Sequence, residues 1–184
     1  MASVKMSVTV PEVSGGRSDE LLDLGVIKAK LFERLKVGDL APDFAIPRIA
    51  GKGKGDQLRL ADYQGKLVLV DFWATWCGPC LAEMPALKDI QKTFGTDPHF
   101  FLISLACDQK DEPARQYIRE NGLIWTHGFA GELSMGVGLS YKVRSIPATF
   151  LIGPDGRILA KNLRGGELKQ AIRMALLPNE RSTK

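Results

Sequence analysis

Two cysteines, Cys77 and Cys80, stand three positions apart with Gly78 and Pro79 between them. A thiolate attacks disulfides, and a second thiol one helical turn away can displace the partner that the first has captured. Pro79 suits the first turn of a helix, where its missing N–H costs little. A helix that begins here would direct unpaired N–H groups and its positive dipole end at Cys77, favouring the thiolate. We expect Cys77 to be exposed and nucleophilic, and Cys80 to be shielded and resolving.

The same spacing is also half of a structural zinc site, which needs two further Cys or His ligands. The residues left for that role are Cys107, His99 and His127, and no two of them have ligand spacing. We therefore predict no metal, and the sequence gives no sign of an organic cofactor. Cys107 is predicted to be a buried, inert thiol. The two histidines are predicted to lie in turns or at the surface.

A strand must precede the cysteine pair, and a helix must follow it. The stretch 66–74 contains the continuous apolar run Leu67–Val70, which is typical of a strand covered on both faces. Residues 79–94 carry apolar side chains at helical spacing. The pair thus falls at a strand-to-helix junction, where ligand sites in α/β sheets are commonly found.

The remaining pattern alternates strands and helices, with a hairpin near each end. It predicts a three-layer α/β sandwich, in which a central mixed sheet has helices on both faces. We expect strands at 41–46, 57–60, 100–106, 147–152 and 157–161, and helices at 112–121, 132–141 and 167–177. The pair 41–46 and 57–60 forms the extra N-terminal hairpin.

Length and composition allow one well-buried core plus an additional segment, because the chain has 184 residues of which 45% are hydrophobic. The formal net charge is +4, and the basic residues are scattered, so the sequence gives no support for nucleic-acid binding. No apolar run approaches the roughly 18 residues that a membrane-spanning helix needs. The first residues lack the apolar core of a secretory signal.

Residues 1–36 differ from the rest of the chain. Apolar and polar residues alternate up to Pro11, as in a strand, and a lone strand cannot bury its own face. We expect this N-terminal extension to be either the tail of an upstream β-sandwich domain or a strap over the main domain. The main domain is predicted at 37–178, and a frayed tail at 179–184.

The segment Val70–Cys80 resembles the active-site segment of thioredoxins. The wider pattern is similar to the TlpA/ResA-like branch of that superfamily, the extracytoplasmic thiol–disulfide oxidoreductases of bacteria. The resemblance covers about residues 36–177, and its further motifs are Val37–Phe44, Leu60–Lys66, Glu83–Pro85, Tyr141–Ile152 and Asp155–Gly156.

This resemblance implies a thioredoxin-like fold in which Cys77 is the nucleophile and Cys80 the resolving thiol. It also implies a cis peptide bond between Ile146 and Pro147. In the family that proline faces the disulfide, and the backbone of the residue before it pairs with a bound peptide.

Three residues around the cysteines are candidates for contact with a partner. Trp76 would give a flat apolar lip beside the sulfur, and Gly78 would let a partner chain approach closely. Pro79 completes this substrate-binding set.

Two carboxyl groups match functional positions of related proteins. Asp71 corresponds to the buried carboxylate of thioredoxins, and Glu83 to the active-site glutamate of the TlpA/ResA-like branch. A buried carboxyl has a raised pKa and can exchange a proton near neutral pH. Asp71 lies in mid-strand and is expected to be the more buried. Which of the two serves Cys80 stays open at this point.

The resemblance implies a thiol–disulfide oxidoreductase acting on protein disulfides or dithiols, with an unidentified electron donor. Gly-Pro between the cysteines resembles the reducing thioredoxins and favours a reductant. One alternative is a peroxiredoxin-like peroxidase, because the Ala41–Phe44 opening and Thr75 recur there. The other is a non-enzymatic docking module. We expect a monomer. We expect an extracytoplasmic location if residues 1–36 continue an upstream domain, and a cytoplasmic one if the chain is complete.

Overall fold

The computed structural model describes residues 34–51 and 55–177. Seven strands and four α-helices alternate along this part of the chain, together with one short 3₁₀ helix. Their bounds are β1 Ala45–Ala50, β2 Gln57–Arg59, η1 Leu60–Tyr63, β3 Leu67–Trp73, α1 Gly78–Phe94, β4 Phe100–Ala106, α2 Asp111–Glu120, β5 Thr126–Phe129, α3 Gly136–Ser140, β6 Ala148–Ile152, β7 Ile158–Lys161 and α4 Gly165–Leu176.

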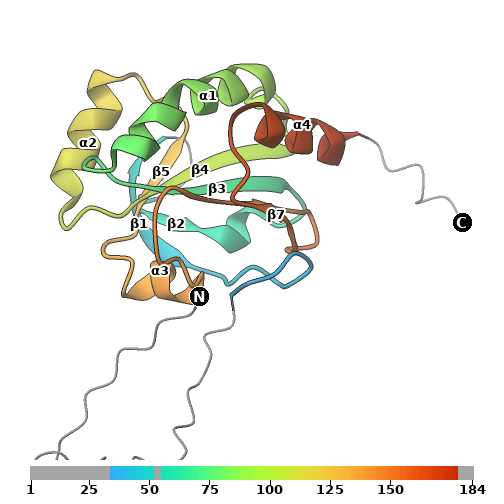
Figure 1. The fold of residues 1–184 in the computed structure, drawn as a ribbon, viewed down its shortest axis with the longest axis horizontal. Helices are drawn as coiled ribbons and strands as arrows, with labels where there is room; N and C mark the ends of the chain where they lie inside the picture. Colours follow the sequence, from blue (N-terminus) through green and yellow to red (C-terminus); the bar gives the residue numbers. More distant parts are fainter. Residues whose placement is uncertain (1–33, 52–54, 178–184) are drawn as a thin grey trace, which may run out of the picture. The chain divides into compact units, whose positions relative to one another are not determined.

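The seven strands form one mixed sheet in the order β2-β1-β5-β4-β3-β6-β7 (Figure 1). β4 runs parallel to its neighbours β3 and β5, whereas β6 pairs antiparallel with β3. β3 is buried along its whole length because it has a strand on each side and helices on both faces. This arrangement explains its unbroken apolar sequence.

Ring contacts show which helix covers which face of the sheet. Phe100 lies opposite Leu67 in the β3–β4 register and packs against Phe94 of α1, with the ring centroids 5.8 Å apart. Trp73 lies on the same face as Leu67, since alternate side chains of a strand share a face, and its ring packs against Tyr117 of α2. α1 and α2 therefore cover the same face.

The opposite face carries α3 and η1. Phe72 points away from Trp73 and packs against Tyr141, which caps the C-terminal end of α3, with 5.4 Å between the ring centroids. Tyr63 of η1 packs on Phe101 in the same way.

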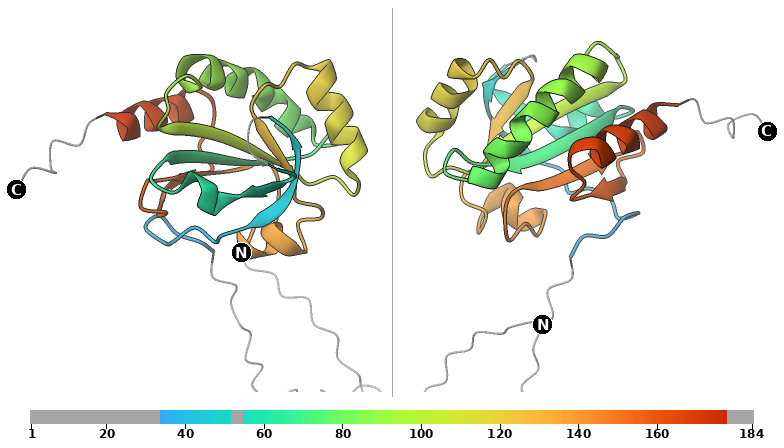
Figure 2. Two further views of the ribbon diagram at one scale, coloured as in Figure 1. Left: turned by 180° about the vertical axis from the view of Figure 1, so that it is seen from behind. Right: turned by 45° about the horizontal axis from the view of Figure 1, so that its top comes forward.

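α4 lies beside α1, and the ion pair between Lys169 and Asp89 joins the two helices (Figure 2). The predicted sandwich with a mixed sheet and helices on both faces is confirmed.

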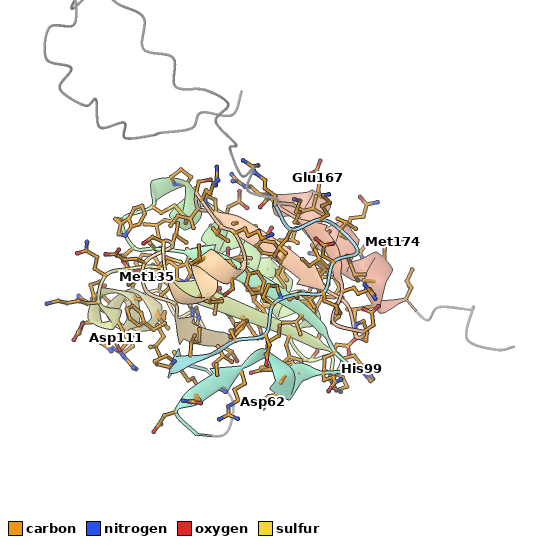
Figure 3. The ribbon with its side chains drawn as sticks, turned by 90° about the horizontal axis from the view of Figure 1, so that it is seen from below. Asp62, His99, Asp111, Met135, Glu167 and Met174 are labelled. Carbon is orange, nitrogen blue, oxygen red and sulfur yellow. A yellow bond between two sulfur atoms is a disulfide. The ribbon has the colours of Figure 1, made fainter. Side chains whose placement is uncertain are left out.

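The predicted N-terminal hairpin is confirmed by the antiparallel pairing of β1 with β2. β5 was not expected, because Thr126–Phe129 has no alternating or continuous apolar pattern. For this reason the placement of His127 in a turn or at the surface is wrong, since its side chain is fully buried in β5. His99 does lie at the surface in a turn (Figure 3).

A compact unit begins at Leu35, close to the predicted start of the main domain. The predicted extension, apart from residues 34–36, and the predicted tail 179–184 lie outside the described residues. The domain boundaries therefore stay predictions. Within the described ranges, no helix is both long enough and apolar enough to cross a membrane.

The central position of β3 leads to a stability prediction. Leu69 is fully buried there, so Leu69→Ala should lower the free energy of unfolding by about 2–5 kcal/mol through lost burial and a cavity. Leu159 in the edge strand β7 is 42% exposed, and Leu159→Ala should cost less than about 1 kcal/mol. Urea unfolding of the oxidised protein measures both. Equal losses would contradict a core that is centred on β3.

Candidate active site

The two cysteines are joined in a disulfide at the start of α1, just beyond the end of β3. Cys77 is the residue that caps this helix, and its sulfur accepts a hydrogen bond of 3.2 Å from the backbone N–H of Cys80. The Cα atoms of the two residues are 5.2 Å apart. The predicted strand-to-helix junction is therefore present, with the helix beginning at Gly78 instead of Pro79.

Both sulfur-bearing side chains are largely covered in this oxidised form. Cys77 keeps 5% of its surface exposed and Cys80 keeps 1%. The expectation of an exposed Cys77 is thus wrong for the disulfide, although the order of exposure is as predicted. The accessible rim consists of Trp76, which is 66% exposed, together with Gly78 and Pro79. A partner must therefore approach the disulfide across this rim.

The electrostatic setting of Cys77 comes from the helix that it caps. α1 has 17 residues, and the first turn of this described helix carries no acidic side chain. The positive end of the helix dipole is therefore not neutralised by the helix's own residues. On reduction of the disulfide, a negative charge on the Cys77 sulfur would lie at that end, which favours the thiolate.

The peptide bond between Ile146 and Pro147 is cis, as the resemblance implied. It directly precedes β6, whose first residue, Ala148, lies opposite Phe72 in β3. The antiparallel pairing thus brings the cis bond to the end of β3 from which the chain leads to Cys77. Both residues are half-buried.

Asp71 lies in mid-strand on the face of the sheet that α1 covers, and only 3% of it is exposed. Burial raises the pKa of its carboxyl group to about 7, helped by the negative charge of Glu83, while a hydrogen bond from Ser104 acts in the opposite direction. A carboxyl with this pKa can accept or return a proton at neutral pH.

Glu83 lies in α1 and is half-buried. Its charge acts on Asp71, so the two carboxyl groups belong to one site. The expectation that Asp71 is the more buried of the two is confirmed.

Two hydrogen-bonded groups near the site were not anticipated. The Ser104 hydroxyl donates to Asp71 across a distance of 3.2 Å, and the indole N–H of Trp125 donates to Ser104 across 2.9 Å. In the loop before Cys77, Thr75 donates its backbone N–H and its hydroxyl to the buried carboxylate of Asp108. The sequence alone pairs none of these residues, because the partners are distant from each other in the sequence.

Cys107 is buried at 4% exposure, and its backbone N–H donates to the carbonyl oxygen of Trp73. Burial raises the pKa of its thiol to about 12, and the charges of Asp71 and Asp108 add to this rise. Cys107 therefore stays a neutral thiol at ordinary pH, and the prediction that it is buried is confirmed.

A cleft of about 730 Å³ opens beside Trp76. Its walls come from the loops that follow β4 and β5 and from the start of α2, and include Lys110, Pro113 and Leu133. No cluster of Cys, His, Asp or Glu suited to a metal ion occurs in residues 34–51 and 55–177.

Residues 37–161 match the sequence model of the AhpC/TSA family. The thiol-disulfide oxidoreductase ResA of Oceanobacillus iheyensis is 34% identical over 125 residues, which are 67% of this chain and 62% of that protein. The chain thus spans less than two thirds of that relative. The thioredoxin-like protein YneN of Bacillus subtilis is 30% identical, over 67% of this chain and 69% of its own length.

Solved structures agree with these sequence relatives. The thioredoxin domain of a thiol-disulfide oxidoreductase from Bacteroides vulgatus superposes with a TM-score of 0.68 at 30% identity. The match covers 76% of this chain and 97% of that domain. The thioredoxin-like fold implied by the sequence resemblance is therefore confirmed.

The raised pKa of Asp71 has a consequence for stability. Because the native pKa is about 7 and the ordinary value is 3.8, the native state holds a proton between these values that the unfolded chain has lost. Stability should therefore fall as the pH rises through this window and level off above it. Asp71→Asn abolishes this fall, so it should be more stable than the wild type at about pH 8, by at most about 4 kcal/mol.

Urea unfolding of the oxidised protein between about pH 4 and 8 checks this prediction. The matched control is Asp62→Asn, since Asp62 is an exposed aspartate of η1 (Figure 3). This control should follow the wild type at every pH. If Asp71→Asn followed it too, the buried carboxyl would not have the raised pKa.

Proposed function

The chain belongs to the AhpC/TSA family, and from this premise we propose that its Cys77–Cys80 dithiol reduces disulfide bonds in partner proteins. The described domain is a thiol–disulfide oxidoreductase domain of thioredoxin-like fold. The direction of exchange and the roles of single residues are our proposals. The observation that carries them is the position of Cys77 at the cap of α1, with Cys80 in the first turn of the same helix.

The reaction begins from the reduced dithiol. The Cys77 thiolate attacks one sulfur of the partner's disulfide, a mixed disulfide forms, and the partner's other sulfur leaves as a thiolate. Cys80 then loses its proton and attacks the Cys77 sulfur, which releases the second partner thiolate. The partner gains two electrons and its thiolates take up protons, while the enzyme is left with the Cys77–Cys80 disulfide.

We propose that Asp71 accepts the proton that Cys80 loses. This carboxyl is buried on the face covered by α1, and burial raises its pKa to about 7, so it can take a proton from a thiol near neutral pH. Glu83 acts as the second carboxyl, because its negative charge keeps Asp71 readily protonated.

The partner's polypeptide is proposed to lie between two edges of the site. On one side the exposed Trp76 offers an apolar surface, and a Cβ added at Gly78 would meet no atom within 4 Å outside its chain neighbours, so this part of the rim is open. On the other side the Ile146–Pro147 segment offers its backbone to the partner. Pro79 completes the rim next to Gly78.

We propose an extracytoplasmic location, with protein disulfides as substrates and a separate electron donor that returns the domain to the dithiol form. The named relatives are bacterial proteins, which supports a bacterial setting. Residues 1–36 are proposed as the tail of an upstream domain, and the catalytic unit as a monomer that uses no cofactor.

If the protein were a peroxiredoxin-like peroxidase, Thr75 would assist a single reactive cysteine. In the structure the Thr75 hydroxyl donates to the buried carboxylate of Asp108, with 2.5 Å between the oxygens, so it is engaged with the loop. The disulfide between the cysteines also gives Cys80 a role that such a peroxidase does not need. These observations favour dithiol–disulfide exchange.

Substitution of each cysteine tests the assignment in an insulin-reduction assay. Cys77→Ser should fall to the uncatalysed background, because the nucleophile is gone. Cys80→Ser should still attack but fail to resolve, so it should accumulate a mixed disulfide that mass spectrometry detects. Cys107→Ser is the matched control and should reduce insulin like the wild type. Equal rates for Cys77→Ser and the wild type, or peroxide turnover as fast as dithiol turnover, would dismiss the proposal.

The direction of exchange is tested separately by the redox potential of the Cys77–Cys80 couple. A reductant should lie near about −270 mV, the value of thioredoxin. Equilibration with glutathione or dithiothreitol buffers measures this potential. A value near about −120 mV would make the domain an oxidant and reverse the proposed direction.

A further inference from the structure

We propose that Ser104 and Trp125 are positioning residues that hold Asp71 in its proton-accepting state under α1. The inference rests on the proposed role of Asp71 as the proton acceptor of Cys80. It adds Ser104 of β4 and Trp125, which directly precedes β5, and neither residue belongs to the active-site motif.

The first step is the pairing of Ser104 with Asp71. These residues lie directly opposite each other in the parallel β3–β4 register, so their side chains stand on the same face of the sheet. The Ser104 hydroxyl donates to a carboxylate oxygen of Asp71 at 3.2 Å, and Ser104 has no exposed surface. A donor to the ionised form favours that form, the more so where water is excluded.

The second step is the orientation of that hydroxyl. The indole N–H of Trp125 donates to the Ser104 oxygen at 2.9 Å. An indole nitrogen can donate but cannot accept, whereas a hydroxyl has one proton and two lone pairs. Trp125 therefore occupies a lone pair of Ser104 and leaves the hydroxyl proton for Asp71. The two hydrogen bonds therefore have one donor-to-acceptor direction, from Trp125 to Ser104 and from Ser104 to Asp71.

The third step is the support of Trp125. Trp125 is 3% exposed and its ring stacks on His127, with ring centroids 5.2 Å apart and an interplanar angle of 28°. His127 lies opposite Ser104 in the β4–β5 register. Burial lowers the pKa of this imidazole to about 3, so His127 is neutral and holds the indole without adding a charge.

The other described groups around Asp71 do not replace Ser104 as the hydrogen-bond donor to its carboxylate. From α1, the charge of Glu83 opposes ionisation of Asp71. From the end of β4, the Cys107 thiol stays neutral because its pKa is raised to about 12. From β6, Thr149 lies opposite Asp71, but its hydroxyl donates to the carbonyl oxygen of Leu163 at 2.9 Å. Among the described side chains, Ser104 is the one whose hydrogen bond lowers the pKa of Asp71.

The test follows the Asp71 carboxyl directly. Infrared or ¹³C NMR titration of the oxidised protein gives the midpoint of its protonation, and Asp71→Asn identifies the signal. Ser104→Ala should raise this midpoint by about one pH unit, because the ionised carboxylate loses its donor. Ser104→Thr keeps a hydroxyl and should restore the wild-type midpoint. Trp125→Phe keeps an aromatic ring on His127 and should shift the midpoint upward by a smaller amount.

The pH profile of insulin reduction is recorded on the same variants. If the carboxyl midpoint and the profile both move upward in Ser104→Ala, the inference and the role of Asp71 are both supported. If the carboxyl midpoint moves but the profile does not, the hydrogen-bonded chain is supported and the proposed role of Asp71 is overturned.

The inference itself is overturned if the carboxyl midpoint of Ser104→Ala equals that of the wild type, whatever the activity. Should Ser104→Ala fail to fold, Trp125→Phe and Ser104→Thr decide. If the carboxyl midpoint of Trp125→Phe equals that of the wild type, Trp125 has no part in positioning Asp71. A Ser104→Thr protein with the wild-type carboxyl midpoint supports the hydroxyl as the donor.

Discussion

The pairing of β3 with β4 on one edge and with β6 on the other is the constraint on which the site depends. It fixes the end of β3, from which the chain leads to Cys77 at the cap of α1. The same pairing brings the cis Ile146–Pro147 bond to that end of the sheet. Backbone hydrogen bonds, which are obligatory in a buried strand, therefore place the disulfide and the proposed peptide-pairing segment together.

Burial of β3 on both faces has a second effect, which is electrostatic. A carboxyl in such a strand loses its hydration, so the pKa of Asp71 rises to about 7. A fold selected for stability alone would place an apolar side chain there. The carboxyl instead gives the site a group that exchanges protons at neutral pH, and the cost is lower stability wherever that group is ionised.

The site combines an open rim with a closed interior. Trp76 and Gly78 face solvent, whereas Cys80 and Asp71 are almost fully covered. In the proposed reaction, protein disulfides reach Cys77 from the rim, whereas the resolving thiol of Cys80 passes its proton to Asp71 away from water. This separation suits an enzyme that must first capture a large partner and then release it.

The sequence by itself determined the chemistry and the framework: the Cys77–Cys80 spacing, the apolar run of β3 and the helix that follows are local patterns, and each was located to within a few residues. Asp71 and Glu83 were identified through the resemblance, which also rests on local motifs.

The tertiary structure alone decided the β5 strand and the contacts that it brings. Thr126–Phe129 lacks a strand pattern and gains its order from pairing with β4 and β1. The hydrogen bonds from Trp125 to Ser104 and from Ser104 to Asp71 join the segment before β5 to β4 and β3. Hydrogen bonds between residues distant in sequence leave no periodic pattern in the sequence.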